Sequence, residues 1–381
     1  MTEKKPISAG KRIVFLLITL FIFFFLIEGI LSVFFYQKYG NSKLATIEFA
    51  RNVRNSFRPK MTPYNPENQK LVRPDSSDAF NDLVTKETAL SNQYEYMPWV
   101  EFKNIDYKGT YMNIEKNIRK SIPDAYYPPN ATDTITVYFF GGSTTFGFNV
   151  ADFETIPSLF VESFKAKNPG KAVKVVNWGC PNYYSYQEMM LFVKLIIDGH
   201  KPDVAIFLDG LNDFWFGKMN YSSESFYSFY FRKSYFAARP PSTSDLWFTD
   251  SLQNLFKTPV GMPEQQFSDK LIGNYLKNIA TIKQLATVTG TKTYFFCQPT
   301  PFYKYPNQMK DPMVFKDTTT RFNYIYPILE KKADSIGNFT FMGALLENES
   351  GYPFVDGFHY APRIHKKIAD RMLDAISKDI N

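Results

Sequence analysis

The chain has 381 residues, of which 44% are hydrophobic and 18% aromatic, and its formal net charge is +7. A composition this apolar supports a large buried core and excludes a mostly disordered chain. The positive charge gathers beside one apolar run near the amino terminus, and no zinc-finger, RRM or basic-helix motif occurs, so we expect no nucleic-acid partner.

The sequence contains two cysteines, Cys180 and Cys297. Two cysteines are too few for a disulfide framework, and neither belongs to a CxxC motif. We expect both to be free, buried thiols at strand ends, with a single bridge between them as the alternative. Neither a metal ion nor a cofactor is expected.

Residues 13–35 read IVFLLITLFIFFFLIEGILSVFF, with Glu28 as their only charge. A helix of this length spans about 34 Å, which is enough to cross a bilayer. The run is too long for a cleaved signal peptide, so we expect an uncleaved signal anchor after a cytoplasmic tail of residues 1–12. Basic residues balance on its two sides, and the orientation therefore rests on the short basic tail, which usually stays inside. We expect a single-pass membrane protein whose catalytic domain is extracytoplasmic, with Glu28 near the interface or paired with a partner helix.

Residues 36–130 predict a stalk followed by an amino-terminal strap. The first part, up to position 75, is basic, polar and interrupted by proline. Residues 94–120 alternate aromatic and polar side chains, a pattern typical of a small β region.

Residues 131–381 predict the main domain, because apolar runs alternate with helical stretches from Thr134 onward. Strands are expected at 136–140, 173–177, 203–209, 292–298 and 339–345. Helices are expected near 154–167, 184–197, 263–289, 319–335 and 362–379. This alternation predicts an α/β domain with a parallel sheet and helices on both faces. An aromatic-rich insertion near 214–262 interrupts it, and its densest part, 214–236, could line a ligand groove, form a second core or lean on a bilayer.

Four short polar motifs fall where predicted strands end, which is where open α/β sheets bind their ligands. They are Gly141-Gly142-Ser143, Asn177-Trp178-Gly179, Gly210-Leu211-Asn212-Asp213 and Asp356-Gly357-Phe358-His359. Each alone is explained equally well by a turn or a helix cap. Their joint order is more specific.

This combination resembles the SGNH (GDSL-type) hydrolases over about residues 134–378, including their membrane-anchored members. The resemblance implies a flavodoxin-like three-layer sandwich, the SGNH-hydrolase fold, behind one transmembrane helix. One departure is Gly142, which stands where the family usually has an acidic residue before the serine.

The resemblance implies that Ser143 is a nucleophile, His359 its general base and Asp356 the carboxylate that orients the imidazole. The oxyanion hole would consist of the backbone N–H groups of Ser143 and Gly179 and the side-chain amide of Asn212. Other chemistries fit worse, because no G-x-S-x-G elbow, P-loop or HExxH motif is present. A glycosidase site is another possible interpretation, with its carboxylates supplied by Asp209, Asp213 and Asp356. That interpretation would leave the serine and the asparagine unexplained.

We therefore expect a membrane-anchored serine esterase that acts through an acyl-enzyme on O-acetyl or lipid esters of a cell-envelope substrate. The substrate could be a polysaccharide or a lipid. The alternatives are an O-acyltransferase working with a membrane-protein partner, and a non-catalytic envelope scaffold on the same fold.

Overall fold

The computed structural model describes residues 9–39, 70–215, 263–314 and 321–380. Residues 40–69 of the predicted stalk and residues 216–262 of the insertion therefore lie outside the described residues, while residues 36–39 continue the first helix. Helix α1 (Ala9–Tyr39) is a unit of its own. By length and composition its stretch Ile13–Ile30 could cross a membrane, and it is the one such helix in the described part of the chain.

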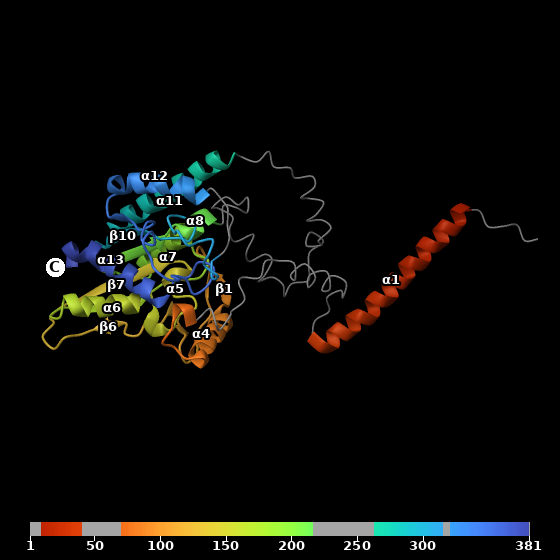
Figure 1. The fold of residues 1–381 in the computed structure, drawn as a ribbon, viewed down its shortest axis with the longest axis horizontal. Helices are drawn as coiled ribbons and strands as arrows, with labels where there is room; N and C mark the ends of the chain where they lie inside the picture. Colours follow the sequence, from red (N-terminus) through yellow and green to blue (C-terminus); the bar gives the residue numbers. More distant parts are fainter. Residues whose placement is uncertain (1–8, 40–69, 216–262, 315–320, 381) are drawn as a thin grey trace, which may run out of the picture. The chain divides into compact units, whose positions relative to one another are not determined.

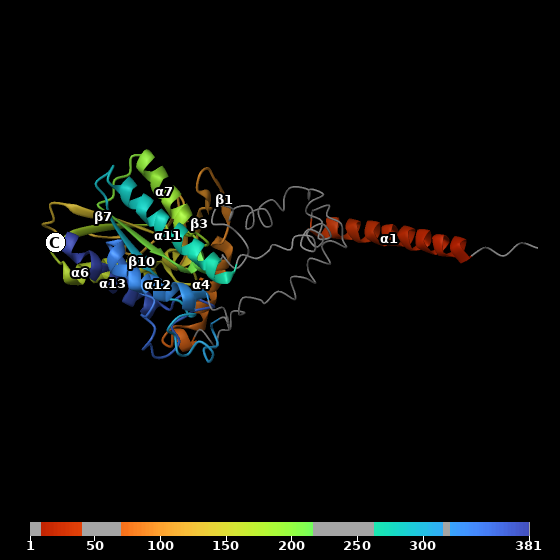
Figure 2. The same ribbon diagram turned by 90° about the horizontal axis from the view of Figure 1, so that it is seen from above.

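The remaining described residues form a compact unit around one sheet (Figures 1 and 2). Its five parallel strands are β7 (Thr134–Gly141), β8 (Ala172–Asn177), β9 (Val204–Asp209), β10 (Lys292–Cys297) and β11 (Phe339–Phe341). They lie in the order β8-β7-β9-β10-β11. Numbered along the chain this order is 2-1-3-4-5, which defines the flavodoxin-like fold. The predicted fold class is confirmed.

Helices cover both faces of the sheet, because alternate side chains of each strand point to opposite sides. Helices α7 (Ser185–Ile197), α11 (Glu264–Ala286) and α12 (Arg321–Ile336) pack with Tyr138 and Phe140 of β7. Helices α6 (Ile156–Lys167) and α13 (Pro362–Ile380) pack with Val137 and Phe139 of the same strand. The three layers follow directly from this alternation.

Three phenylalanine rings stack across three neighbouring strands of the sheet. Phe140 on β7 lies opposite Phe207 on β9, and Phe207 lies opposite Phe295 on β10. The ring centroids are 4.7 Å and 5.1 Å apart. Aromatic pairs of this kind stabilise by about 0.5–1.5 kcal/mol beyond their buried area. Because these strands are parallel, the loops that follow β7, β9 and β10 start from the same edge of the sheet.

The strap preceding β7 forms more structure than the sequence predicted. It contains helix α4 (Asp78–Ser91), the hairpin of β1 (Tyr94–Met97) and β2 (Glu101–Asn104), and the short strands β3 (Tyr107–Lys108), β4 (Asn113–Glu115), β5 (Ile118–Arg119) and β6 (Ala125–Tyr126). Strands β5 and β6 pair antiparallel with β8, so the sheet is mixed and extends outward to β3. Strands this short carry almost no periodicity, which is why only a small β region was predicted.

Candidate active site

The turn after β7 places Ser143 at the carboxyl edge of the sheet. Ser143 is the first residue of the single-turn helix α5 (Ser143–Phe146) and is 7% exposed. A Cβ at Gly141 would lie 2.0 Å from Thr145 Oγ1 and 2.9 Å from the carbonyl oxygen of Leu208. Only glycine fits between strand β9 and the first turn of this helix.

Gly142 is required for a different reason. A Cβ at this position would lie 2.5 Å from Asn212 Nδ2 and 2.9 Å from the carbonyl oxygen of Tyr183. The amide of Asn212 therefore occupies the space that a side chain at position 142 would need.

Asp356 and His359 form a buried pair in the loop before α13. His359 Nδ1 lies 2.7 Å and 2.8 Å from the two carboxylate oxygens of Asp356. Burial raises the pKa of Asp356, but the charge of His359 and hydrogen bonds from His359 and Asn149 outweigh it, so the net pKa is lowered. An ionised carboxylate has no proton to give, so Nδ1 carries the hydrogen and Nε2 is the basic nitrogen.

Nε2 of His359 is buried and has no hydrogen-bond partner within the described ranges. It is therefore not bonded to Ser143 Oγ in this structure. Hydrogen bonds between catalytic groups are often long before substrate binds and tighten in the complex.

The serine loop and the histidine loop are in direct contact. The ring of Phe148, five residues after Ser143, stacks on the His359 imidazole with centroids 4.6 Å apart. A second link runs through Gln298 at the end of β10, whose amide accepts from Thr144 Oγ1 at 3.1 Å and donates to Tyr360 OH at 3.2 Å. These contacts bring the neighbours of Ser143 and His359 together from distant parts of the chain.

Asn212 is the predicted oxyanion donor that the structure places best. It lies in α8 (Leu211–Trp215), directly after β9. One hydrogen of its Nδ2 is donated to the carbonyl oxygen of Tyr183 at 2.7 Å. The amide has a second hydrogen, and the same nitrogen lies against Gly142, next to Ser143.

Gly179 is engaged within its own loop. Its N–H donates to Asn177 Oδ1 at 3.0 Å, and a Cβ here would lie 2.4 Å from the backbone nitrogen of Phe146. Glycine is thus needed for close packing against α5. Its role as an oxyanion donor stays a prediction, since that hydrogen bond would have to break first.

The other two histidines have structural surroundings. His365 is buried in α13, where its Nδ1 lies 2.8 Å from the carbonyl oxygen of Glu154, and burial lowers its pKa to about 4. His200 lies ahead of β9, where its Nδ1 is 2.8 Å from Tyr138 OH and its ring packs against Trp178. Of the three, only His359 faces a carboxylate at the carboxyl edge of the sheet.

Two buried carboxyl groups, Glu188 and Asp209, and the half-buried Asp213 form a cluster beside the site, a feature that the sequence did not predict. Glu188 of α7 and Asp209 of β9 have no hydrogen-bond partner in the described part of the chain unless one of them is protonated and donates to the other. Burial raises the pKa of both well above the usual value. Burial also raises the pKa of Asp213 to about 6, although Ser185 Oγ donates to it.

This cluster predicts that Asp209→Asn stabilises the protein at alkaline pH. A carboxyl group whose pKa is higher in the folded state costs stability as pH rises from about 4 through the folded-state value. Replacing this carboxyl group with a neutral amide is expected to raise the free energy of unfolding by about 1–3 kcal/mol at pH 8 and by much less at pH 5. Thermal unfolding of the full-length protein in detergent at both pH values measures this. An equal difference at the two pH values would contradict it.

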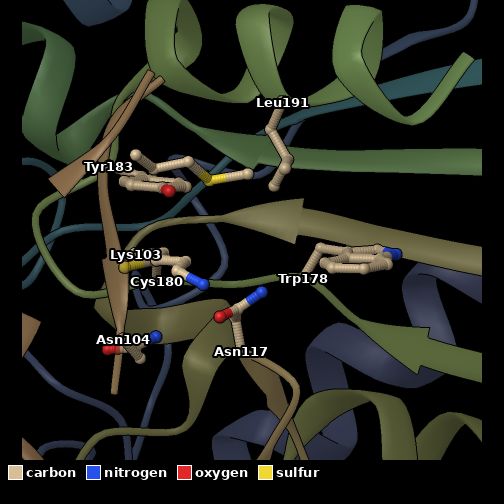
Figure 3. A pocket seen from close by; sticks show the side chains of 8 residues that line it. Lys103, Asn104, Asn117, Trp178, Cys180, Tyr183 and Leu191 are labelled. Atoms are coloured by element: carbon tan, nitrogen blue, oxygen red, sulfur yellow. The ribbon is translucent and has the colours of Figure 1, made fainter. Parts of the chain in front are cut away.

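A pocket lies beside the loop that follows β8, with about 250 Å³ of empty space including its open mouth (Figure 3). Asn104, Trp178, Cys180 and Tyr183 line it, and none of the predicted catalytic residues does.

Burial raises the pKa of the Cys180 thiol well above its usual value, so this sulfur is protonated and a poor nucleophile. Both cysteines are free and buried, as predicted. No three His, Cys, Asp or Glu side chains in the described segments are placed to hold a metal ion.

No protein-family model matches this chain, and no curated protein matches it. Several solved structures are similar to it. TesA has 13% identity and a TM-score of 0.39 over 64% of this chain and 98% of its own. A catalytic mutant of Axe2, an acetylxylan esterase from Geobacillus stearothermophilus, has 14% identity and a TM-score of 0.36 over 66% and 96%. The psychrotrophic esterase EstA from Pseudoalteromonas has 13% identity and a TM-score of 0.33 over 65% and 98%.

Proposed function

We propose that this protein is a serine esterase with Ser143 as nucleophile, His359 as general base and Asp356 as the residue that orients the base. The observation that carries the proposal is the buried Asp356–His359 pair, whose unpartnered Nε2 belongs to a ring stacked on the loop of Ser143. A buried basic nitrogen without a partner, on a ring that packs against the loop of a strand-end serine, fits the base of an acyl-transfer site.

The chemistry follows from these positions. His359 Nε2 takes the proton of Ser143 Oγ as the oxygen attacks the ester carbonyl. The imidazolium that forms is stabilised by Asp356, which already holds Nδ1. The protonated Nε2 then gives its proton to the leaving alcohol, and an acyl-enzyme remains. Water attacks the acyl-enzyme with His359 again as base, which releases the acid and restores Ser143.

The negative oxygen of the tetrahedral intermediate needs donors that are already in place. Asn212 supplies one, because its amide is fixed by Tyr183 and has one hydrogen to spare. The backbone N–H of Ser143 supplies a second, since no hydrogen bond of this group is found among the described residues. Together they hold the oxyanion beside Gly142.

Helix α1 supports a membrane location for this activity. We place the catalytic domain outside the cytoplasm because a short basic tail precedes the helix. Substrates there would be ester-linked acyl groups, either O-acetyl groups or lipid esters, on a cell-envelope polysaccharide or lipid.

The test is covalent labelling of the full-length protein in detergent with a fluorophosphonate probe, which reacts with activated serines. Wild-type protein should be labelled, and Ser143→Ala should not be. Ser350→Ala is the matched control, because Ser350 is exposed in a loop outside the site, and its labelling should equal that of the wild type. Absence of wild-type labelling, or equal labelling of Ser143→Ala, would rule the function out.

A further inference from the structure

Asn149 stands out in the segment that joins the serine loop to the rest of the domain. It lies between α5 and the 3-10 helix η1 (Asp152–Glu154), and its φ is 60°, in the left-handed region that few residues other than glycine adopt. Its side-chain amide donates at 2.5 Å to Asp356 Oδ2. A strained backbone that presents a side chain to a functional carboxylate calls for a functional explanation.

Arg73 fixes the backbone of Asn149 from one side. Arg73 Nη2 donates to the carbonyl oxygen of Asn149 at 2.9 Å. The same guanidinium group pairs with Glu154 at 2.8 Å, and Glu154 in turn accepts from the backbone N–H of Ala151 at 2.9 Å. Arg73 is 7% exposed, so solvent screens this pair little.

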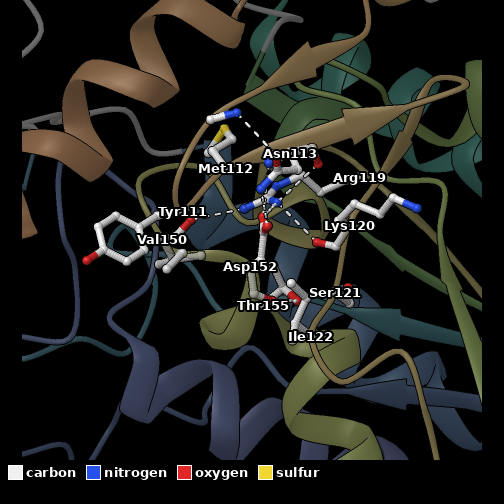
Figure 4. A network of polar contacts seen from close by, with 12 residues as sticks. Tyr111, Met112, Asn113, Arg119, Lys120, Ser121, Ile122, Val150, Asp152 and Thr155 are labelled. Carbon is white, nitrogen blue, oxygen red and sulfur yellow. Dashed lines mark hydrogen bonds and ion pairs between the residues drawn. The ribbon is translucent and has the colours of Figure 1, made fainter.

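Arg119 of β5 fixes the next residue (Figure 4). Its Nη2 donates to the carbonyl oxygen of Val150 at 3.1 Å, and its Nη1 is bound to Asp152. Arg119 is fully buried and lies over the ring of Phe146, the last residue of α5, at 5.4 Å. The strap therefore holds the segment on both sides of Asn149.

Three adjacent residues thus have three different anchors. Phe148 stacks on His359, Asn149 donates to Asp356, and Val150 is held by Arg119. The backbone N–H of Phe148 also donates to the carbonyl oxygen of Ser143 at 3.0 Å. The segment is a rigid connection between the nucleophile and the acid–base pair.

We propose that Asn149 is a positioning residue that orients the Asp356 carboxylate toward His359 Nδ1, with Arg73 and Arg119 holding Asn149 in its left-handed conformation. The inference rests on the proposed esterase function. Oδ1 of Asp356 is bound by the backbone N–H groups of Phe358 and His359, at 3.3 Å and 3.1 Å. The other oxygen, Oδ2, lies 2.8 Å from His359 Nδ1 and accepts its second hydrogen bond from Asn149. Without it, the carboxylate can rotate away from the imidazole.

Asn149→Gly tests this role, because glycine adopts the left-handed conformation without strain and removes only the side chain. We expect kcat to fall about 10- to 100-fold while KM stays within about twofold, since a misplaced catalytic group affects the transition state and not substrate binding. The melting temperature should be unchanged or higher. A purely structural residue would instead lower the melting temperature and leave kcat unchanged.

A double-mutant cycle shows whether Asn149 acts through Asp356. The readout is the rate of fluorophosphonate labelling of Ser143 in full-length protein. Asn149→Gly should slow labelling about 10- to 100-fold in the wild-type background but less than about twofold in the Asp356→Ala background. An equal factor in both backgrounds, or no effect in either, would overturn the proposal. A wild-type protein that is not labelled at all would overturn the esterase function and this inference with it. Wild-type labelling that depends on Ser143 but not on Asn149 would overturn this inference alone.

Discussion

Replacement of His359 with alanine is expected to lower ester turnover by about 10⁴- to 10⁶-fold. Of the three histidines, His359 is the one that pairs with a carboxylate at the carboxyl edge of the sheet in the described part of the chain, so neither of the others can replace its Nε2 as base. Without a base, Ser143 keeps its proton and remains a weak nucleophile. The measurement is kcat/KM with p-nitrophenyl acetate, using full-length protein in detergent.

His200→Gln is the control for this experiment. His200 contacts Tyr138 and Trp178 ahead of β9, so its replacement should change turnover by less than about twofold. If His359→Ala kept more than a tenth of the wild-type rate, His359 could not be the general base. A comparable loss in His200→Gln would indicate that the assay reports damage to the fold.

Replacement of Asn212 with alanine is expected to lower kcat by about 10²- to 10³-fold with little change in KM. Loss of one oxyanion donor raises the barrier by about 3–4 kcal/mol, because the charge that it stabilises appears only in the transition state. The amide of Asn212 is held in place by the carbonyl oxygen of Tyr183, so it needs no rearrangement when the charge develops. Steady-state kinetics and the rate of fluorophosphonate labelling should fall together.

Asn278→Ala is the matched control for the loss of an amide. Asn278 of α11 donates to Ser185 Oγ at 2.9 Å and is not among the residues at the serine turn. It should retain kcat within about twofold at a similar melting temperature. If Asn212→Ala raised KM and left kcat unchanged, Asn212 would bind the substrate and not the oxyanion.

The strand and helix order of the domain could be predicted because parallel strands are buried on both faces and read as continuous apolar runs. Strand β9 is such a run, and every one of its six residues is buried. The predicted bounds of the long helices differ from those observed by only a few residues. The pairing of β5 and β6 with β8 could not be predicted, because two-residue strands are defined by their partners and not by their own pattern.

The site shows the same division. Ser143, Asn212, Asp356 and His359 could be named as candidates because each belongs to a short motif, and the first two come directly after β7 and β9; their catalytic roles stay predictions. Asn149 could not, since one asparagine in FGFNVADFE reads as an ordinary loop residue, and its left-handed backbone depends on Arg73 far away in the chain. Glu188 likewise reads as the solvent side of an amphipathic helix, and only the packing against Asp209 shows that it is buried.

The two outermost strands of the sheet are both short. Strand β3 has two residues and β11 has three. Longer strands at these margins would offer rows of unpaired amides to another molecule, which is how sheets recruit one another into aggregates. A version of the protein cut just ahead of Thr134 would remove β5 and β6 and leave the six residues of β8 bare on one flank. The strap therefore also covers the edge of β8 and prevents it from pairing with another copy of the chain, so any shortened form has to retain the strap.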